Sequence, residues 1–109
     1  LGDIGTFFPS QDPKYKDISS GILLRSTGEL LKAHGWQIGN IDATIIAQQP
    51  HLAPFFGQMR NNVSQILGIS KEQVAMKATT TDGLGFTGRG EGIAAQAIAL
   101  VKVEKEEDI

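Results

Sequence analysis

The residues best suited to bind phosphate are three consecutive threonines, Thr79, Thr80 and Thr81, which begin the stretch TTTDGLGFTGRGEGIA. Threonine hydroxyls donate hydrogen bonds, and backbone N–H groups beyond the end of a strand are free to do the same. Both kinds of donor suit phosphate oxygens. The alternative is a β-branched strand terminus without a ligand, and composition alone favours this alternative.

The glycines that follow match a nucleotide-binding pattern, because residues 83–88 read G-x-G-x-x-G. A dinucleotide-binding loop of this kind opens a helix and is followed about 20 residues later by an acidic residue that binds ribose. In this chain the glycines continue from Gly88, the last of the pattern, to Gly90 and Gly92. They disfavour a helix, since each glycine costs about 1 kcal/mol relative to alanine. We therefore interpret the match as accidental.

Two opposite charges, Arg89 and Glu91, stand within the same glycine-rich stretch. Charges presented on such a scaffold can face a ligand or a symmetry axis. The alternative is an exposed ion pair worth about 0–1 kcal/mol. The residues alone leave both interpretations open.

Acidic residues and histidines that could act elsewhere are few. Asp3 and Asp12 can bind the hydroxyl groups of a polar ligand, and they are equally good turn formers. His34 and His51 have no second histidine nearby, whereas a catalytic zinc ion needs three protein ligands. The chain has no cysteine and no G-x-S-x-G sequence, so the motifs of the common protein nucleophiles are missing.

The composition narrows the class of protein. A chain of 109 residues with 40% hydrophobic residues corresponds to a single domain or a piece of one, numbered 1–109. The net charge of −2 argues against a surface that binds nucleic acid or acidic membranes. No apolar run approaches the roughly 18 residues of a membrane span. The absence of cysteine fits a reducing cytosol.

Two helices are indicated by apolar periodicity and by their end signals. Residues 1–16 read as loop, because they are rich in Gly, Pro, Asp and Ser. A helix capped by Asp17 or Ser19 is expected to run to about His34. A second helix is expected from about residue 56 to a terminator at Gly68, followed by a single turn with capping-box spacing.

Alternating residues indicate strands over 39–49 and 74–81. Residues 93–103 fit either a strand or a helix by periodicity, and the acidic tail at 104–109 is expected to fray. The predicted fold class is α+β, with helices packed on one face of a small sheet. The other face must meet water or a partner, and its Ala and Ile content favours a partner.

Three stretches, LGDIGTFFPSQDP, IDATIIAQQPHLAP and MKATTTDGLGFTGRGEGIA, closely resemble the motifs of the 2-C-methyl-D-erythritol 2,4-cyclodiphosphate synthase family. The resemblance covers essentially the whole chain. It implies a lyase of the non-mevalonate isoprenoid pathway, which cyclises 4-diphosphocytidyl-2-C-methyl-D-erythritol 2-phosphate and releases CMP. The implied chemistry is metal-assisted phosphoryl transfer without a protein nucleophile. The implied assembly is a homotrimer with mixed β-sheets around the threefold axis and active sites between neighbouring subunits.

The resemblance also implies a role for individual residues. Residues 3–5 would line the methylerythritol end of the substrate, and residues 8–12 would cover the same end. Residues 47–53 would hold cytosine, and residues 79–82 would bind the diphosphate. The substrate-binding residues would be Asp3, Ile4, Gly5, Phe8, Pro9, Ser10, Gln11, Asp12, Ala47, Gln48, Gln49, Pro50, His51, Leu52, Ala53, Thr79, Thr80, Thr81, Asp82, Phe86 and Arg89.

Within that set, Thr80 would be the catalytic residue that stabilises the transition state, and Asp82 would lie beside a bridging magnesium ion. Arg89 and Glu91 would face the trimer axis, where an apolar cavity can hold an isoprenoid diphosphate. The family's zinc ligands belong to a segment that we expect to precede Leu1. Residues 1–109 would therefore include no zinc ligand.

Some positions depart from the family pattern. Ser10 and Gln11 stand where aspartate and threonine are usual, which argues against a charge-dependent role at Ser10. Asp82 replaces the usual glutamate and is one methylene shorter. His51 stands where lysine is common, which changes little if that residue acts through its backbone.

Two other functions stay open. One is a catalytically incompetent trimeric scaffold or an isoprenoid-diphosphate-binding remnant without the zinc site. The other is a small-molecule-sensing module, which predicts no cytidine binding at residues 47–53. No nucleic acid or membrane is expected as a partner. The expected location is the bacterial cytoplasm, with a plastid-type organelle as the alternative.

Overall fold

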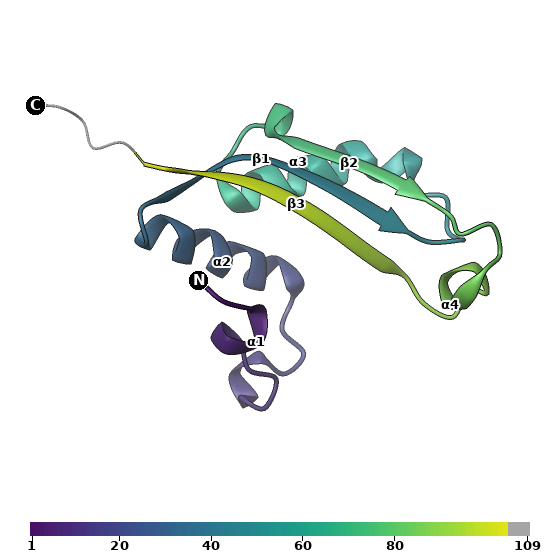
Figure 1. Ribbon diagram of the computed structural model, residues 1–109, viewed down its shortest axis with the longest axis horizontal. Coiled ribbons are helices and arrows are strands. Elements are labelled where there is room, and N and C mark those ends of the chain that lie inside the picture. The colour runs from purple at the N-terminus through teal and green to yellow at the C-terminus, as the bar shows by residue number, and fades with distance from the viewer. Residues whose placement is uncertain (105–109) are drawn as a thin grey trace, which may run out of the picture.

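The computed structural model describes residues 1–104, which form a three-stranded sheet with two long helices (Figure 1). The strands are β1 (Trp36–Ile46), β2 (Val74–Thr79) and β3 (Ala94–Val103), in the spatial order β2–β1–β3. Strand β1 is parallel to β2 and antiparallel to β3, so the sheet is mixed. The predicted α+β class is confirmed. The acidic tail from residue 105 onward lies outside the described residues.

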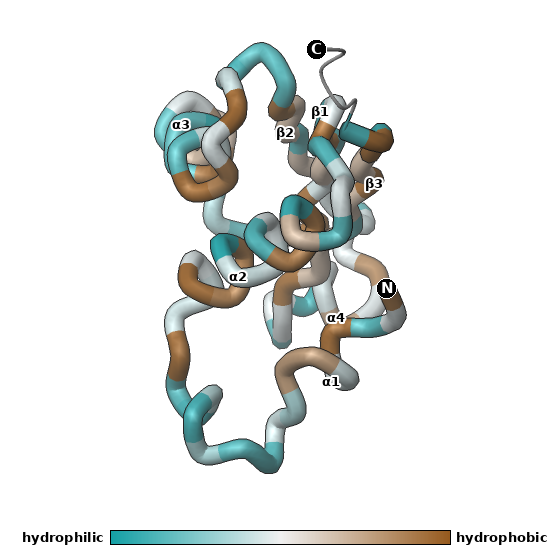
Figure 2. Tube along the Cα trace, turned by 90° about the vertical axis from the view of Figure 1, so that its left-hand side faces the viewer, coloured by the Kyte–Doolittle hydropathy of each residue, from teal (hydrophilic) through white to brown (hydrophobic). Residues whose placement is uncertain are grey.

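Both predicted helices are present. Helix α2 (Ser20–Ala33) is capped by the hydroxyl of Ser19 rather than by Asp17. Helix α3 (Phe56–Leu67) ends at Gly68, whose φ of 69° is the left-handed conformation that glycine adopts without a steric penalty. Figure 2 shows α2 and α3 on the same side of the sheet, as predicted. None of the helices among residues 1–104 is long and apolar enough to cross a lipid bilayer.

Helix α3 is the crossover that allows β1 and β2 to run parallel. The guanidinium of Arg60 on α3 donates to the carbonyl oxygens of Val74, at 2.8 Å, and Lys71, at 2.9 Å. These bonds anchor the helix to the start of β2. Val74 is only 2% exposed, so the core lies between α3 and this strand.

Residues 93–103, which the sequence leaves between strand and helix, form strand β3 from Ala94 onward. Its Ala99 pairs with Ile41, which also pairs with the buried Val74, so the three side chains share the face that the helices cover. Ile98 on the opposite face is 78% exposed. The antiparallel pairing with β1 favours a strand over a helix, because it bonds the backbone of β3 to residues that are far away in sequence.

Three predicted boundaries are wrong. The first strand begins at Trp36 rather than at residue 39, because pairing between Trp36 and Val103 holds the chain extended there. It ends at Ile46 rather than at residue 49, and its partner strand ends at Thr79, which pairs with Ile46, rather than at residue 81. Residues 1–16 are not wholly loop, since they contain the short helix α1 (Ile4–Phe7) and the 3-10 turn η1 (Pro13–Tyr15).

The glycine-rich stretch contains a one-turn helix, α4 (Gly85–Gly88), where the glycine content predicted none. The turn is closed by bonds from the N–H of Gly88 to the Leu84 carbonyl, at 3.1 Å, and from the N–H of Arg89 to the Gly85 carbonyl, at 3.0 Å. A dinucleotide loop would instead open a long helix leading to a parallel strand. Strand β3 follows α4 and is antiparallel to β1, in agreement with an accidental match.

The remaining short elements are also single turns. They are η2 (Ala53–Phe55), which leads into α3, and η3 (Lys71–Gln73), which leads into β2. The second turn was expected from the spacing of Ser70 and Gln73. The Gln73 side-chain oxygen accepts the Ser70 N–H at 2.9 Å.

Candidate functional site

A surface hollow of about 230 Å³ lies at the carboxyl ends of strands β1 and β2. One side comes from residues 47–53, which we call the nucleobase loop after the role that the sequence resemblance implies, and the other from the end of β2. The lining residues are Ala47, Gln48, Pro50, His51, Leu52, Ala53, Phe56, Ala78, Thr79 and Thr80. Ligands of sheets with parallel strands characteristically bind beyond these carboxyl ends.

Sheet pairing explains why these two segments meet. Ile46 and Thr79, the last residues of the parallel strands, are partners in register. The ladder continues one step further, because the N–H of Ala47 donates to the Thr79 carbonyl at 3.0 Å. Ala47 is 6% exposed. The chain segments that leave the two strands therefore start side by side.

The segment that leaves β2, residues 79–83, forms a turn that we call the threonine turn. The Thr80 hydroxyl oxygen accepts the Asp82 N–H at 3.2 Å and lies 3.4 Å from an Asp82 carboxylate oxygen. Asp82 has a φ of 54°, a left-handed conformation that aspartate tolerates better than most residues. Both side chains are exposed. The turn thus presents a hydroxyl and a carboxylate together.

Thr81 is oriented differently from Thr80. Its hydroxyl donates to the Leu84 carbonyl at 2.5 Å and lies 2.9 Å from the hydroxyl oxygen of Thr87. A hydroxyl has a single proton, so Thr87 is the donor of the second bond. Thr87 is 5% exposed. The Thr81 side chain is thus bonded within the turn and does not line the hollow.

Arg89 and Glu91 form a bidentate ion pair beyond α4. The Arg89 Nε lies 2.9 Å from Glu91 Oε1, and Nη2 donates to Oε2 at 3.1 Å. Both side chains are more than half exposed. The nearby Leu84 and Phe86 are also exposed. The tip of the molecule therefore combines a paired charge with uncovered apolar surface.

The N-terminal residues are held by local hydrogen bonds. The Asp3 carboxylate caps α1 by accepting the Thr6 hydroxyl at 2.6 Å and the Thr6 N–H at 2.8 Å. The hydroxyl first, and then the backbone bond, lowers the pKa of Asp3 below its ordinary value. Asp12 caps η1 by accepting the Lys14 N–H at 3.0 Å. Both acids have the turn-forming role that was one of the two alternatives.

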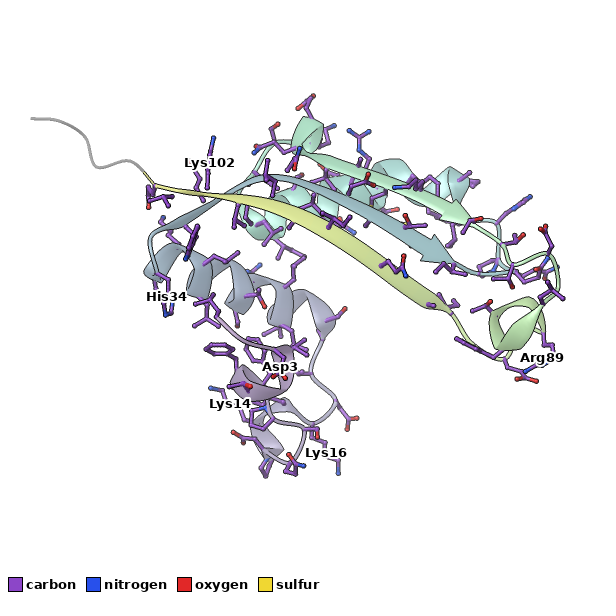
Figure 3. The ribbon with its side chains drawn as sticks, in the orientation of Figure 1. Asp3, Lys14, Lys16, His34, Arg89 and Lys102 are labelled. Atoms are coloured by element: carbon purple, nitrogen blue, oxygen red, sulfur yellow. The ribbon has the colours of Figure 1, made fainter. Side chains whose placement is uncertain are left out.

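The structure leaves these N-terminal residues apart from the hollow between β1 and β2. Asp3, Ile4 and Phe8 line a second hollow of about 350 Å³ against α2, and the two hollows share no residue. In Figure 3, Asp3 lies below α2, whereas Arg89 lies at the far end of the sheet. Within this chain, residues 47–53 meet Thr79 and Thr80, and residues 3–12 do not join them.

Metal-binding residues are sparse. Among residues 1–104, no three His, Cys, Asp or Glu side chains gather where they could hold a metal ion. The Nδ1 atom of His34 is bonded to the Leu30 carbonyl at 2.8 Å. These residues do not fit zinc, which takes at least three protein ligands. Asp82 fits magnesium, which commonly takes one or two carboxylates together with phosphate oxygens.

Four residues of this region were not predicted to contribute to the site. Phe56 was expected only as a helix residue, but it lines the hollow, as does Ala78. Thr87 supports the threonine turn, and an added Cβ at Gly88 would lie 2.2 Å from the carbonyl carbon of Gly83. Only Gly88 carried a signal, as part of the glycine pattern. The other three act through contacts between elements, which residue type does not reveal.

The fold and the hollow define an α+β domain with its candidate site at the carboxyl edge of a parallel strand pair. The chain belongs to the YgbB family, which it matches over residues 1–102. The resemblance seen in the three sequence stretches is thereby confirmed.

Two curated relatives in this family share a name. The 2-C-methyl-D-erythritol 2,4-cyclodiphosphate synthase of Moorella thermoacetica is 54% identical over 101 residues, covering 93% of this chain and 62% of that protein. The synthase of the same name from Alkaliphilus metalliredigens is 57% identical over 101 residues, covering 93% and 64%. The chain thus spans less than two thirds of the length of these relatives.

Solved structures agree with the fold. The bifunctional IspDF of Campylobacter jejuni superposes with a TM-score of 0.90 at 37% identity, covering 94% of this chain and 28% of that one. IspF of Plasmodium falciparum, in a complex with CDP, gives a TM-score of 0.78 at 30% identity, covering 96% and 62%. These similarities confirm the mixed-sheet α+β architecture.

Proposed function

We propose that the protein converts 4-diphosphocytidyl-2-C-methyl-D-erythritol 2-phosphate to 2-C-methyl-D-erythritol 2,4-cyclodiphosphate and releases CMP. The observation that carries this proposal is the hollow shared by the nucleobase loop and the threonine turn. It occurs in a chain 54% identical to a synthase of that name. The CDP complex of a structural relative supports a cytidine diphosphate group as the ligand of this hollow.

The proposed reaction is an intramolecular phosphoryl transfer. An oxygen of the substrate's 2-phosphate bonds to the β-phosphorus. The bond from that phosphorus to the oxygen shared with the α-phosphate breaks, and CMP leaves with this oxygen. The nucleobase loop holds cytosine, largely through its backbone, and thereby orients the diphosphate for in-line attack. No covalent bond to the protein forms.

Hydrogen-bond donors of the threonine turn act on the charge that develops on the transferring phosphoryl group. The exposed hydroxyl of Thr80 is the proposed catalytic donor, and Thr79 contributes to diphosphate binding. Asp82 is the residue that would hold a magnesium ion, and such an ion neutralises phosphate charge when bound. Residues 1–104 do not fit zinc, so none of them is assigned a role in holding that ion.

The N-terminal residues need a different arrangement to reach substrate. Because residues 3–12 lie apart from the hollow, we propose that they serve the site of a neighbouring subunit in a homotrimer. Arg89 and Glu91, with the exposed Phe86, are proposed to lie near the threefold axis, where an apolar cavity would accept an isoprenoid diphosphate. Light scattering should give a mass three times that of the subunit. A monomer at micromolar concentration would contradict the assembly.

The activity is tested with the full-length protein and the cytidylyl substrate. We expect CMP release in the presence of zinc and magnesium, and loss of release after chelation by EDTA. The nucleotide product is separated and quantified by chromatography. Absence of CMP release at full occupancy of both metals would contradict the enzyme. A trimer that still bound CDP would then be the scaffold considered as the alternative.

The location proposed for this activity is the cytoplasm of a bacterium. The support is the bacterial origin of the two synthases from Moorella thermoacetica and Alkaliphilus metalliredigens.

A further inference from the structure

We infer that Gln48 is a positioning residue, which ties the nucleobase loop to the threonine turn and sets the spacing between the two halves of the site. The inference rests on the proposed function for the identity of the ligand, a cytidine diphosphate group. The contact itself belongs to the protein. The Gln48 side-chain oxygen accepts the backbone N–H of Gly83 at 3.1 Å.

This bond joins segments that are 35 residues apart in sequence. Gln48 follows the buried Ala47 directly, is itself half-buried and lines the hollow. Gly83 follows Asp82 directly and has a φ of 79°. The glutamine amide is therefore placed between the proposed cytosine-binding residues and the proposed magnesium ligand.

The hydrogen bond between Gln48 and Gly83 connects the threonine turn to the nucleobase loop beyond the ends of the strands. The last rung of the sheet joins Ala47 to Thr79. Within the described chain, the other hydrogen bonds of residues 80–88 join them to one another or to near neighbours in sequence. Without Gln48, the turn would keep its internal shape but lose its connection to the opposite side of the hollow.

The spacing matters because a single ligand must contact both sides at once. If the threonine turn is already held, a diphosphate binds to it without having to order it. If the turn can move relative to the loop, ordering the turn costs free energy, and the outer phosphate is bound more weakly by that amount. We call the bond between Gln48 and Gly83 the tether. Its loss should thus weaken diphosphate binding more than binding of the cytosine end.

The test compares Gln48→Met, which keeps the side-chain length but removes the amide acceptor, with the wild type in the full-length protein. Gln65→Met is the matched control, because Gln65 is an exposed residue of α3 outside the hollow. Affinities for CMP and CDP are measured by calorimetry. We expect Gln48→Met to weaken CDP binding by about threefold to tenfold, the range for one hydrogen bond, and CMP binding by about twofold or less. Gln65→Met should change neither affinity.

A second measurement tests the bond between Gln48 and Gly83 in the absence of a ligand. Amide hydrogen exchange at Gly83 should be faster in Gln48→Met than in the wild type. Gln48→Glu keeps an acceptor oxygen and should restore slow exchange. Only hydrogen exchange is compared for this variant, since its negative charge would also repel phosphate and so change the nucleotide affinities.

The outcomes are distinct. Unchanged exchange at Gly83 in Gln48→Met would overturn the tether. Faster exchange with equal losses of CMP and CDP affinity would overturn the positioning role. Wild-type protein that bound neither nucleotide would overturn the proposed function and the positioning role with it, while the dependence of Gly83 exchange on Gln48 would still establish the tether.

Discussion

The nucleobase loop and the N-terminal arm, residues 1–16, both carry residues expected in one site, but the chain holds them by different means. The loop leaves a parallel strand pair and is joined to the threonine turn by a backbone rung and by Gln48. The arm is shaped by the local caps of Asp3 and Asp12, and it contacts α2. Figure 1 shows α1 and α4 apart along the length of the molecule.

The difference teaches that a cap shapes a segment but does not place it. The bonds of Asp3 and Asp12 span two or three residues, so they would form wherever the arm lay. An aromatic contact between Phe8 and Tyr15, with ring centroids 5.5 Å apart, is likewise internal to the arm. Bonds between distant residues instead define where the nucleobase loop lies relative to the threonine turn.

The largest expected effect comes from Gly88→Ala, which disrupts the close approach of the Gly88 backbone to the Gly83 backbone in the threonine turn. The new Cβ would lie 2.2 Å from the Gly83 carbonyl carbon, so the turn must move. We expect a loss of about 1–3 kcal/mol in unfolding free energy and loss of CMP release. Thermal denaturation and the release assay measure both quantities.

Gly5→Ala is the matched substitution in the arm. The nearest atom to its added Cβ is an Asp3 carboxylate oxygen at 3.8 Å, an ordinary contact. The melting temperature should therefore stay near that of the wild type. Equal melting temperatures for Gly5→Ala and Gly88→Ala would refute the contrast between the two regions.

A smaller effect is expected from Thr80→Val, which removes the exposed hydroxyl but keeps the side-chain shape. If this hydroxyl acts on the transferring phosphoryl group, turnover should fall on the order of a hundredfold. Thr80→Ser keeps a hydroxyl and should recover most of the turnover. Steady-state kinetics of CMP release measure both variants. Full turnover in Thr80→Val would remove Thr80 from the catalytic group.

The smallest effect concerns the Asp3 cap in the arm. Thr6→Val removes the hydroxyl that is the main cause of the lowered Asp3 pKa, while the Thr6 N–H bond remains. The pKa should rise part of the way toward its ordinary value of 3.8. A carboxyl NMR titration measures this change, and an unmoved pKa would contradict the capping role.

The sign of the pH dependence follows from the direction of the shift. A carboxylate with a lowered folded-state pKa stabilises the fold above its unfolded-state pKa. This contribution of Asp3 is present at neutral pH and is lost as the pH falls from about 4 through the lowered pKa. Thr6→Val should narrow the pH range over which this contribution is lost, because it raises the folded-state pKa of Asp3 toward the ordinary value.

Much of the secondary structure could be predicted because its causes are local. Ser19 caps a helix through its own hydroxyl, and Gly68 ends one through its own backbone freedom. The arm was misjudged because its glycines and prolines suggested loop, although Asp3 and Thr6 have the spacing of a cap. Strand ends were misjudged for another reason, since Trp36 is extended only because Val103 lies opposite.

The sequence by itself determined the family, the helices, and the motifs that carry the threonines and the nucleobase loop, because these depend on residue types and short spacings. Only the tertiary structure decided that the loop and the turn meet, that Thr80 is exposed while Thr81 bonds inward, and that the arm lies apart. Each of these outcomes depends on hydrogen bonds and packing between elements, such as the register that pairs Ile46 with Thr79. Such pairings join residues that are distant in the chain, and no local pattern encodes their spacing.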